Sequence, residues 1–206
     1  MCIRDSDSHY YLVPGVIVTI MTMIGALLTS LVMAREYERG TLESLFVTPV
    51  GSGEILTAKA ATNFLLGMVS LAISMVFAAF VFDIPIRGSL LLLLAVSALF
   101  LIVALGLGLV ISTATKNQFL ACQFAIMGTF MPALMLSGFL YDILNMPPAV
   151  RAVTYLIPAR YYVTLLQTLF LAGDIPSVII PCCITLGVFA VVLMSIARLK
   201  APKSLE

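Results

Sequence analysis

Residues whose side chains can do chemistry are few in this sequence, and their spacing excludes several kinds of site. The single histidine is His9, and the four cysteines are Cys2, Cys122, Cys182 and Cys183. The cysteines have no CxxC spacing and no histidine cluster beside them, so a zinc or haem site is not predicted. The sequence also contains no GxxxxGK[ST] loop, so we expect no nucleotide or metal cofactor bound by this chain itself.

Charged side chains gather between Arg35 and Lys59. Seven of the chain's 11 basic and 10 acidic residues lie in this segment. None of the charges falls inside the long apolar runs of the sequence. Because ionisable residues inside a membrane usually mark ion coupling or other membrane-embedded chemistry, an ion-driven transporter and an intramembrane protease are both disfavoured.

A short amphipathic helix is predicted directly after Gly40, a residue that suits the end of the preceding helix. Thr41 can cap the new helix and Pro49 ends it. Its apolar face has i, i+3, i+4 spacing and consists of Leu42, Leu45 and Phe46. Such a helix either lies on lipid headgroups or binds a protein. Since its polar face carries Glu43 rather than the Lys and Arg of typical lipid-surface helices, a protein partner is at least as plausible.

The elements that must position these residues are membrane helices. The chain has 206 residues, of which 62% are hydrophobic and 10% charged, with a mean hydropathy of +1.15. A soluble domain carries about 25% charged residues, so this chain cannot cover a water-facing surface. Its net charge of +1 gives no basic field for nucleic acid, and no nucleic-acid partner is expected.

Five runs free of charge are long enough to cross a membrane. None alternates in the two-residue pattern of a β-barrel strand, so the predicted fold class is all-α, a polytopic helical membrane protein. A sixth run, residues 161–173, is too short to span and suits a re-entrant or interfacial helix. The five predicted spans are residues 11–34, 60–82, 88–115, 117–141 and 175–197.

Basic residues predict the orientation of these spans. Loop 35–59, Lys116 and the tail 198–206 carry seven Lys and Arg residues, whereas the opposite side carries four. The positive-inside rule therefore places the first set, and with it the C-terminus, in the cytoplasm. The predicted organisation is a short N-terminal segment 1–10, a transmembrane domain 11–197 and a cytoplasmic tail.

Several motifs resemble those of a known family. One is Glu38-Arg39-Gly40-Thr41-Leu42-Glu43, followed by Val47-Thr48-Pro49-Val50, and another is Pro158-Ala159-Arg160-Tyr161-Tyr162. Together with Lys116-Asn117-Gln118, they are similar in order and position to motifs of ABC-2 type transporter permeases, the membrane-spanning subunits of ABC exporters. The resemblance covers essentially residues 10–200.

The resemblance implies a longer protein. The family usually has six spans per subunit, and in the exporter branch a large extracytoplasmic domain separates the first two. The five runs of this chain then correspond to helices two to six. We therefore expect that residues 1–10 replace or truncate a longer natural N-terminus; a genuine short tail is the alternative.

The resemblance also implies partners and a mechanism. In such permeases the loop helix docks on a separate ATP-binding subunit, which binds ATP and Mg, and two permease subunits form a homo- or heterodimer in the lipid bilayer. The coupling loop is residues 35–59. The residues expected to make the ATPase coupling contacts are Arg35, Glu36, Glu38, Arg39, Gly40, Thr41, Leu42, Glu43, Leu45 and Phe46.

The outer segment, residues 142–174, is too long for a simple connection. Prolines divide it into two stretches that can each form a short helix, 149–157 and 159–171. The resemblance implies a re-entrant helical hairpin at the outer exit. Arg151 and Arg160 either contact lipid headgroups or an anionic substrate, or serve as structural anchors at the interface. The residues expected to matter here are Pro158, Arg160, Tyr161 and Tyr162.

The sequence thus favours a permease subunit of an ABC-2 type exporter in the plasma (inner) membrane, driven by ATP hydrolysis elsewhere and not itself an enzyme. The alternatives are an ATP-independent permease or channel and a non-transporting membrane scaffold. An apolar pathway does not discriminate between drugs, lipids, polysaccharides and ions as substrates.

Overall fold

A computed structural model describes residues 3–39, 52–80, 88–138 and 147–200, and no strand occurs in these ranges. Three stretches of π-helix, named η, continue neighbouring α-helices. The elements are α1 (Ile3–Thr22), η1 (Met23–Leu28), α2 (Thr29–Arg39), α4 (Ser52–Phe80), α5 (Leu90–Thr115), α6 (Gln118–Ala125), η2 (Ile126–Phe130), α7 (Met131–Leu136), α8 (Pro148–Thr154), α9 (Pro158–Gln167), η4 (Thr168–Ala172) and α10 (Pro176–Lys200).

Within the described ranges, five helical segments are long and apolar enough to cross a membrane. Each overlaps one of the charge-free runs, so the prediction of an all-α polytopic membrane protein is confirmed. The division into a short N-terminus, a transmembrane domain and a tail stays a prediction. The five segments are Val13–Arg39, Thr57–Ala78, Leu90–Thr115, Gln118–Leu136 and Pro176–Leu199.

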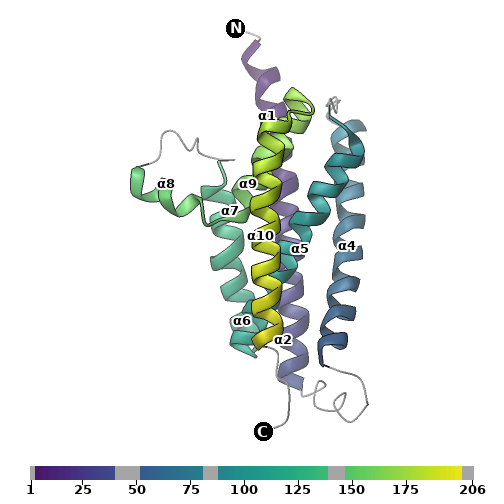
Figure 1. Ribbon diagram of the computed structural model, residues 1–206, viewed down its shortest axis with the longest axis vertical. Helices are drawn as coiled ribbons and strands as arrows, with labels where there is room; N and C mark the ends of the chain where they lie inside the picture. Colours follow the sequence, from purple (N-terminus) through teal and green to yellow (C-terminus); the bar gives the residue numbers. More distant parts are fainter. Residues whose placement is uncertain (1–2, 40–51, 81–87, 139–146, 201–206) are drawn as a thin grey trace.

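Helix α5 lies among the other membrane-spanning helices, which run roughly along the long axis of the molecule (Figure 1). It packs against α10, α4, α9 and the continuous α1–η1–α2 helix. Half of its most apolar window is buried, against 17% for α10. A helix that is apolar on all sides is expected in the interior of a bundle, and Phe100 and Leu101 of α5 are fully buried.

Glycine lets α5 approach the α1–η1–α2 helix closely. A Cβ atom on Gly108 would lie 2.6 Å from the carbonyl oxygen of Ala26 and 2.9 Å from the Cβ of Thr29. A Cβ on Gly25 would lie 2.5 Å from the Cβ of Ala104. Small residues at helix contacts are a common packing device in membranes.

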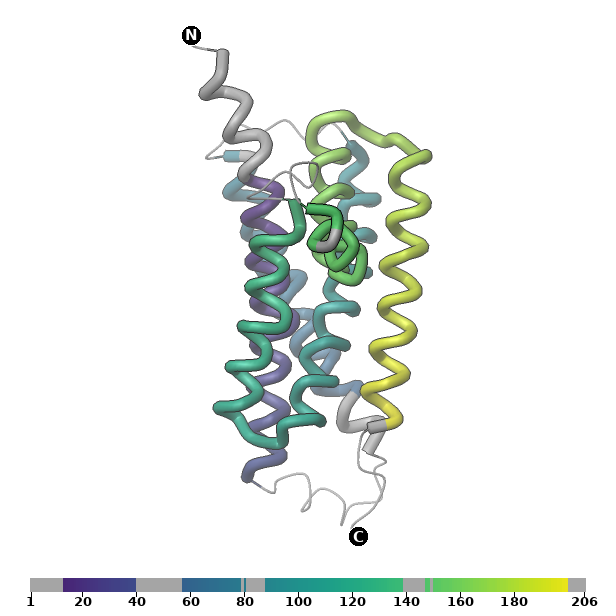
Figure 2. Tube along the Cα trace, turned by 90° about the vertical axis from the view of Figure 1, so that its left-hand side faces the viewer, coloured from purple at the N-terminus to yellow at the C-terminus, as the bar shows by residue number. Residues whose placement is uncertain are grey.

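The outer segment folds back into the bundle. Helix α8 lies to one side in Figure 1, below the level at which α10 begins. Figure 2 shows α9 and η4 running from the level of α8 back to the end of the molecule where α10 starts. Helices α8 and α9 thus overlap the two stretches predicted to be helical, 149–157 and 159–171, and each begins one residue earlier. Residues 139–146 lie outside the described ranges.

Candidate functional site

The end of α2 carries four of the predicted coupling residues: Arg35, Glu36, Glu38 and Arg39. It lies at the same end of the molecule as the start of α6 and the end of α10 (Figure 1). The remaining six predicted coupling residues lie outside the described residues. They are Gly40, Thr41, Leu42, Glu43, Leu45 and Phe46.

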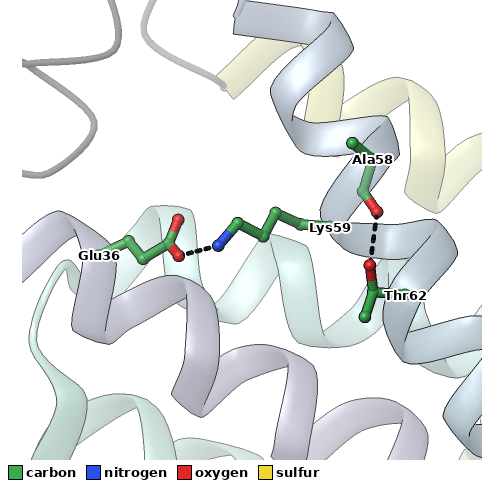
Figure 3. Close-up of polar contacts among 4 residues, drawn as sticks. All are labelled: Glu36, Ala58, Lys59 and Thr62. Carbon is green, nitrogen blue, oxygen red and sulfur yellow. Dashed lines mark hydrogen bonds and ion pairs between the residues drawn. The ribbon is translucent and has the colours of Figure 1, made fainter.

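Glu36 forms an ion pair with Lys59 of α4. Figure 3 shows the two side chains pointing toward each other from neighbouring helices. The Glu36 side chain is 18% exposed and the Lys59 side chain 40% exposed, so the pair is partly shielded from water. Because Glu36 precedes and Lys59 follows residues 40–51 in the sequence, the ion pair links the two helices on either side of that segment.

Glu38 connects the same end of α2 to the start of α6. Its Oε2 accepts a hydrogen bond from the backbone N–H of Gln118 at 3.0 Å. Asn117 caps the helix as well, since its Oδ1 accepts from the N–H groups of Phe119 (3.0 Å) and Leu120 (3.2 Å). The first N–H groups of a helix have no partner within the helix and carry a partial positive charge, so a carboxylate is favoured there.

The turn before α6 is tight because Lys116 adopts a left-handed conformation with φ of 50°. This is the turn that the sequence places at Lys116-Asn117-Gln118. Neither Lys59 nor Gln118 was among the predicted coupling residues. Their signal in the sequence is weak: Lys59 is one of seven charges in its segment, and Gln118 takes part through its backbone.

A second set of polar contacts joins the same three helices nearer the middle of the bundle. The Asn63 Nδ2 donates to Thr29 Oγ1 at 3.1 Å, which joins α4 to α2. Ser30 Oγ donates to the carbonyl oxygen of Ala121 at 3.3 Å, which joins α2 to α6. All three side chains are buried. Helix α2 is therefore connected to α4 and α6 at two levels.

In the outer segment, Arg160 fastens the turn between α8 and α9. Its guanidinium donates to Thr154 Oγ1 and lies 4.0 Å from the centre of the Tyr155 ring. Thr154, which is fully buried, in turn donates to the carbonyl oxygen of Arg151 at 2.8 Å. A hydrogen bond from Arg160 and its positive charge lower the pKa of the Tyr155 hydroxyl. These contacts favour the structural-anchor interpretation of Arg160.

Pro158 and the two tyrosines position α9 against the bundle. Pro158 occupies the first turn of α9, where its missing N–H costs no hydrogen bond. The Tyr161 hydroxyl donates to the carbonyl oxygen of Tyr155 at 3.0 Å. The fully buried Tyr162 donates to Ser97 Oγ of α5 at 2.8 Å. It also stacks on Phe100, with ring centroids 4.1 Å apart.

Comparison with known proteins points to one family. The family described as ABC-2 type transporter matches residues 3–171. The chain is 47% identical over 199 residues to the "Probable multidrug ABC transporter permease YbhS" of Escherichia coli strain K12, covering 97% of this chain and 53% of that protein.

Two further Escherichia coli K12 proteins are similar. "Probable multidrug ABC transporter permease YbhR" is 31% identical over 168 residues, which cover 80% of this chain and 45% of YbhR. "Inner membrane transport permease YhhJ" is 28% identical over 190 residues, which cover 92% of this chain and 50% of YhhJ. The chain thus spans about half the length of these curated relatives.

Proposed function

Because this chain belongs to the ABC-2 type transporter family, we propose that it forms the translocation pathway of an ABC exporter. In this proposal a second permease subunit completes the pathway. A separate ATP-binding subunit, which holds ATP and Mg, supplies the energy. The sequence supports this division, because it contains five apolar spans and no phosphate-binding loop.

The observation that carries the proposal is the set of contacts at the end of α2. Glu36 is paired with Lys59 of α4, and Glu38 is bonded to the start of α6. A force applied to the coupling loop, residues 35–59, reaches three spans directly. Packed helices that are joined by such contacts shift as rigid elements. Docking of a partner on the loop can therefore alter how the helices of the pathway pack.

The proposed docking contacts are the apolar face of Leu42, Leu45 and Phe46, with the charged residues around it setting register and specificity. Burial of each large apolar side chain contributes about 1.5–3 kcal/mol before ordering costs. Burial of three such side chains is enough to matter for docking.

The test is retention of the ATP-binding subunit by a charge-reversed permease. We expect Glu43→Lys to lower the amount of that subunit that co-purifies with the full-length protein, together with ATP-dependent transport. Arg151→Glu is the matched control for retention of the ATP-binding subunit, because Arg151 is exposed at the outer segment, away from the coupling loop. Equal retention and transport by Glu43→Lys would count against docking at this loop, and transport that needs no ATP-binding subunit would favour an ATP-independent permease.

We also propose that the protein lies in the inner membrane with its C-terminus in the cytoplasm. The basic residues at the ends of α2 and α10, with Lys59 and Lys116, support this orientation under the positive-inside rule. One of the relatives is named as an inner-membrane permease.

A further inference from the structure

A cavity of about 230 Å³ lies where four parts of the chain meet. Its lining comes from α1, from α5, from η2 with α7, and from the turn between α8 and α9. Only Thr22 and Thr129 contribute polar side chains among the described residues that line it. Ligand pockets are typically apolar with a few polar groups that fix orientation, and this cavity has that composition.

The helical backbone changes its hydrogen-bond pattern beside both threonines. Thr22 directly precedes η1, and Thr129 lies within η2. The hydroxyl of Thr22 donates to Val18 O at 2.7 Å and that of Thr129 to Ala125 O at 2.5 Å. Each oxygen keeps acceptor capacity for a further donor. Short π-helical insertions occur frequently at functional sites, and two of them adjoin this cavity.

The walls of the cavity are held in place by contacts outside it. Phe100 is stacked on Tyr162, which is itself anchored to Ser97. The turn between α8 and α9 is fixed by Arg160 and by the Tyr161 hydroxyl. Because these groups are packed or hydrogen-bonded, the cavity is preformed rather than dependent on a ligand to open it.

The cavity is large enough to hold a small organic molecule. An engineered apolar cavity of about 150 Å³ binds benzene, and this one is larger. A second hollow, of about 330 Å³, is lined by α1 and α4 alone, and its two hydroxyl groups, those of Ser70 and Ser74, are only half-buried. The first cavity differs because it combines four elements with two buried hydroxyl groups.

We propose that the cavity beneath the α8–α9 turn binds an uncharged, largely apolar molecule that carries a hydroxyl or similar donor. The threonine oxygens accept its hydrogen bond, and Phe100 and Leu156 contact its apolar body. A role for this site in export rests on the proposed function. Binding of the molecule to the cavity does not rest on that function.

The test is photolabelling with 3-azioctanol, an uncharged alcohol that carries a diazirine. The protein is reconstituted in phosphatidylcholine vesicles, irradiated, digested and analysed by mass spectrometry. We expect saturable labelling of residues 128–136 and 153–159, displaced by excess octanol. Labelling of the hollow between α1 and α4 serves as an internal reference and should rise linearly with the concentration of the probe.

Gly128 offers a way to fill the cavity. It lines the cavity, and a Cβ placed on it meets no atom within 4 Å. Gly128→Leu should therefore weaken saturable labelling roughly tenfold. Gly187→Leu is the matched control, because Gly187 lies on the spanning helix α10 and also has open space at its Cβ. It should leave the labelling unchanged.

A second variant tests the hydrogen bond independently of cavity filling. Thr129→Val keeps the shape of the side chain and removes the hydroxyl, so binding of azioctanol should fall about fivefold. Binding of an alkyl diazirine without a hydroxyl should not change. Labelling that is linear, spread evenly over the apolar surface, or equal in wild type and both variants would overturn the proposal. Saturable labelling of a protein that transports without any ATP-binding subunit would support the site and contradict the exporter function.

Discussion

At the scale of single residues, the acidic side chains at the end of α2 have partners within the subunit. Glu36 pairs with Lys59, and Glu38 caps α6 through the N–H of Gln118. The sequence assigned both carboxylates to a docking surface alone. The structure shows that they also hold α2 beside two other spans, so changing them affects the permease itself as well as any contact with a partner.

Reversing the charge of Lys59 should destabilise this end of the bundle. Lys59→Glu places two carboxylates together, whereas the double variant Glu36→Lys, Lys59→Glu restores opposite charges. Because the pair is partly exposed, we expect a coupling free energy of about 1 kcal/mol in the double-mutant cycle. Thermal unfolding of the purified variants in detergent measures it. If the double variant loses as much free energy of unfolding as the two single variants lose together, the two side chains do not stabilise each other.

At the scale of elements, the contact between α5 and the α1–η1–α2 helix depends on a missing side chain. Gly108→Ala would place a Cβ 2.6 Å from the carbonyl oxygen of Ala26, a backbone atom that cannot turn away. We expect a loss of about 1–3 kcal/mol in the free energy of unfolding. Gly187→Ala meets no atom within 4 Å and should be neutral or stabilising by up to about 1 kcal/mol, since alanine favours a helix.

Unfolding by denaturant in mixed micelles compares the two glycine variants directly. If Gly108→Ala is as stable as Gly187→Ala, the helices have room to move apart at this contact. If only Gly108→Ala is destabilised, the close approach of the helices is a real constraint on the bundle.

Patterns along one element were predictable, and contacts between elements were less so. Long charge-free runs indicated the spans, because a bilayer requires their length and polarity. Proline positions separated α8 from α9. The ion pair of Glu36 with Lys59, however, joins residues 23 positions apart, and the bond of Glu38 to the Gln118 N–H joins residues 80 apart. Those pairings depend on how the helices pack. The motif at Pro158 was recognised from its sequence, but the bond of Tyr162 to Ser97 required the fold.

At the scale of the whole molecule, the contacts of Glu36 and Glu38 lie at one end and the α8–α9 turn lies toward the other. The charged end includes the end of α2, the start of α6 and the end of α10 (Figure 1). The proposed cavity lies next to the α8–α9 turn. In the proposed mechanism, a partner that acts on the coupling loop affects the cavity through the α1–η1–α2 helix and through α6–η2–α7, both of which contain π-helical stretches beside the threonines. Under the proposed function, movement along these two helices carries energy from the partner to a bound molecule.

The two ends of α10 provide a test of how the whole molecule lies in the membrane. This helix has 25 residues and is about 37 Å long, enough to cross the hydrocarbon core. Ser177 and Arg198 are exposed near its opposite ends. In a variant whose four natural cysteines are replaced by serine, Ser177→Cys should react with a membrane-impermeant maleimide added to intact cells. Arg198→Cys should react only after the membrane is permeabilised.

Arg39→Cys at the exposed end of α2 should behave like Arg198→Cys, because both lie at the charged end of the bundle. The opposite result, with Arg198→Cys labelled from outside and Ser177→Cys protected, would invert the orientation. The coupling loop would then face away from the cytoplasm, where ATP is available, and the proposed docking of an ATP-binding subunit could not occur. Agreement of all three positions would place Glu36, Glu38 and Lys59 on the side where such a subunit can bind.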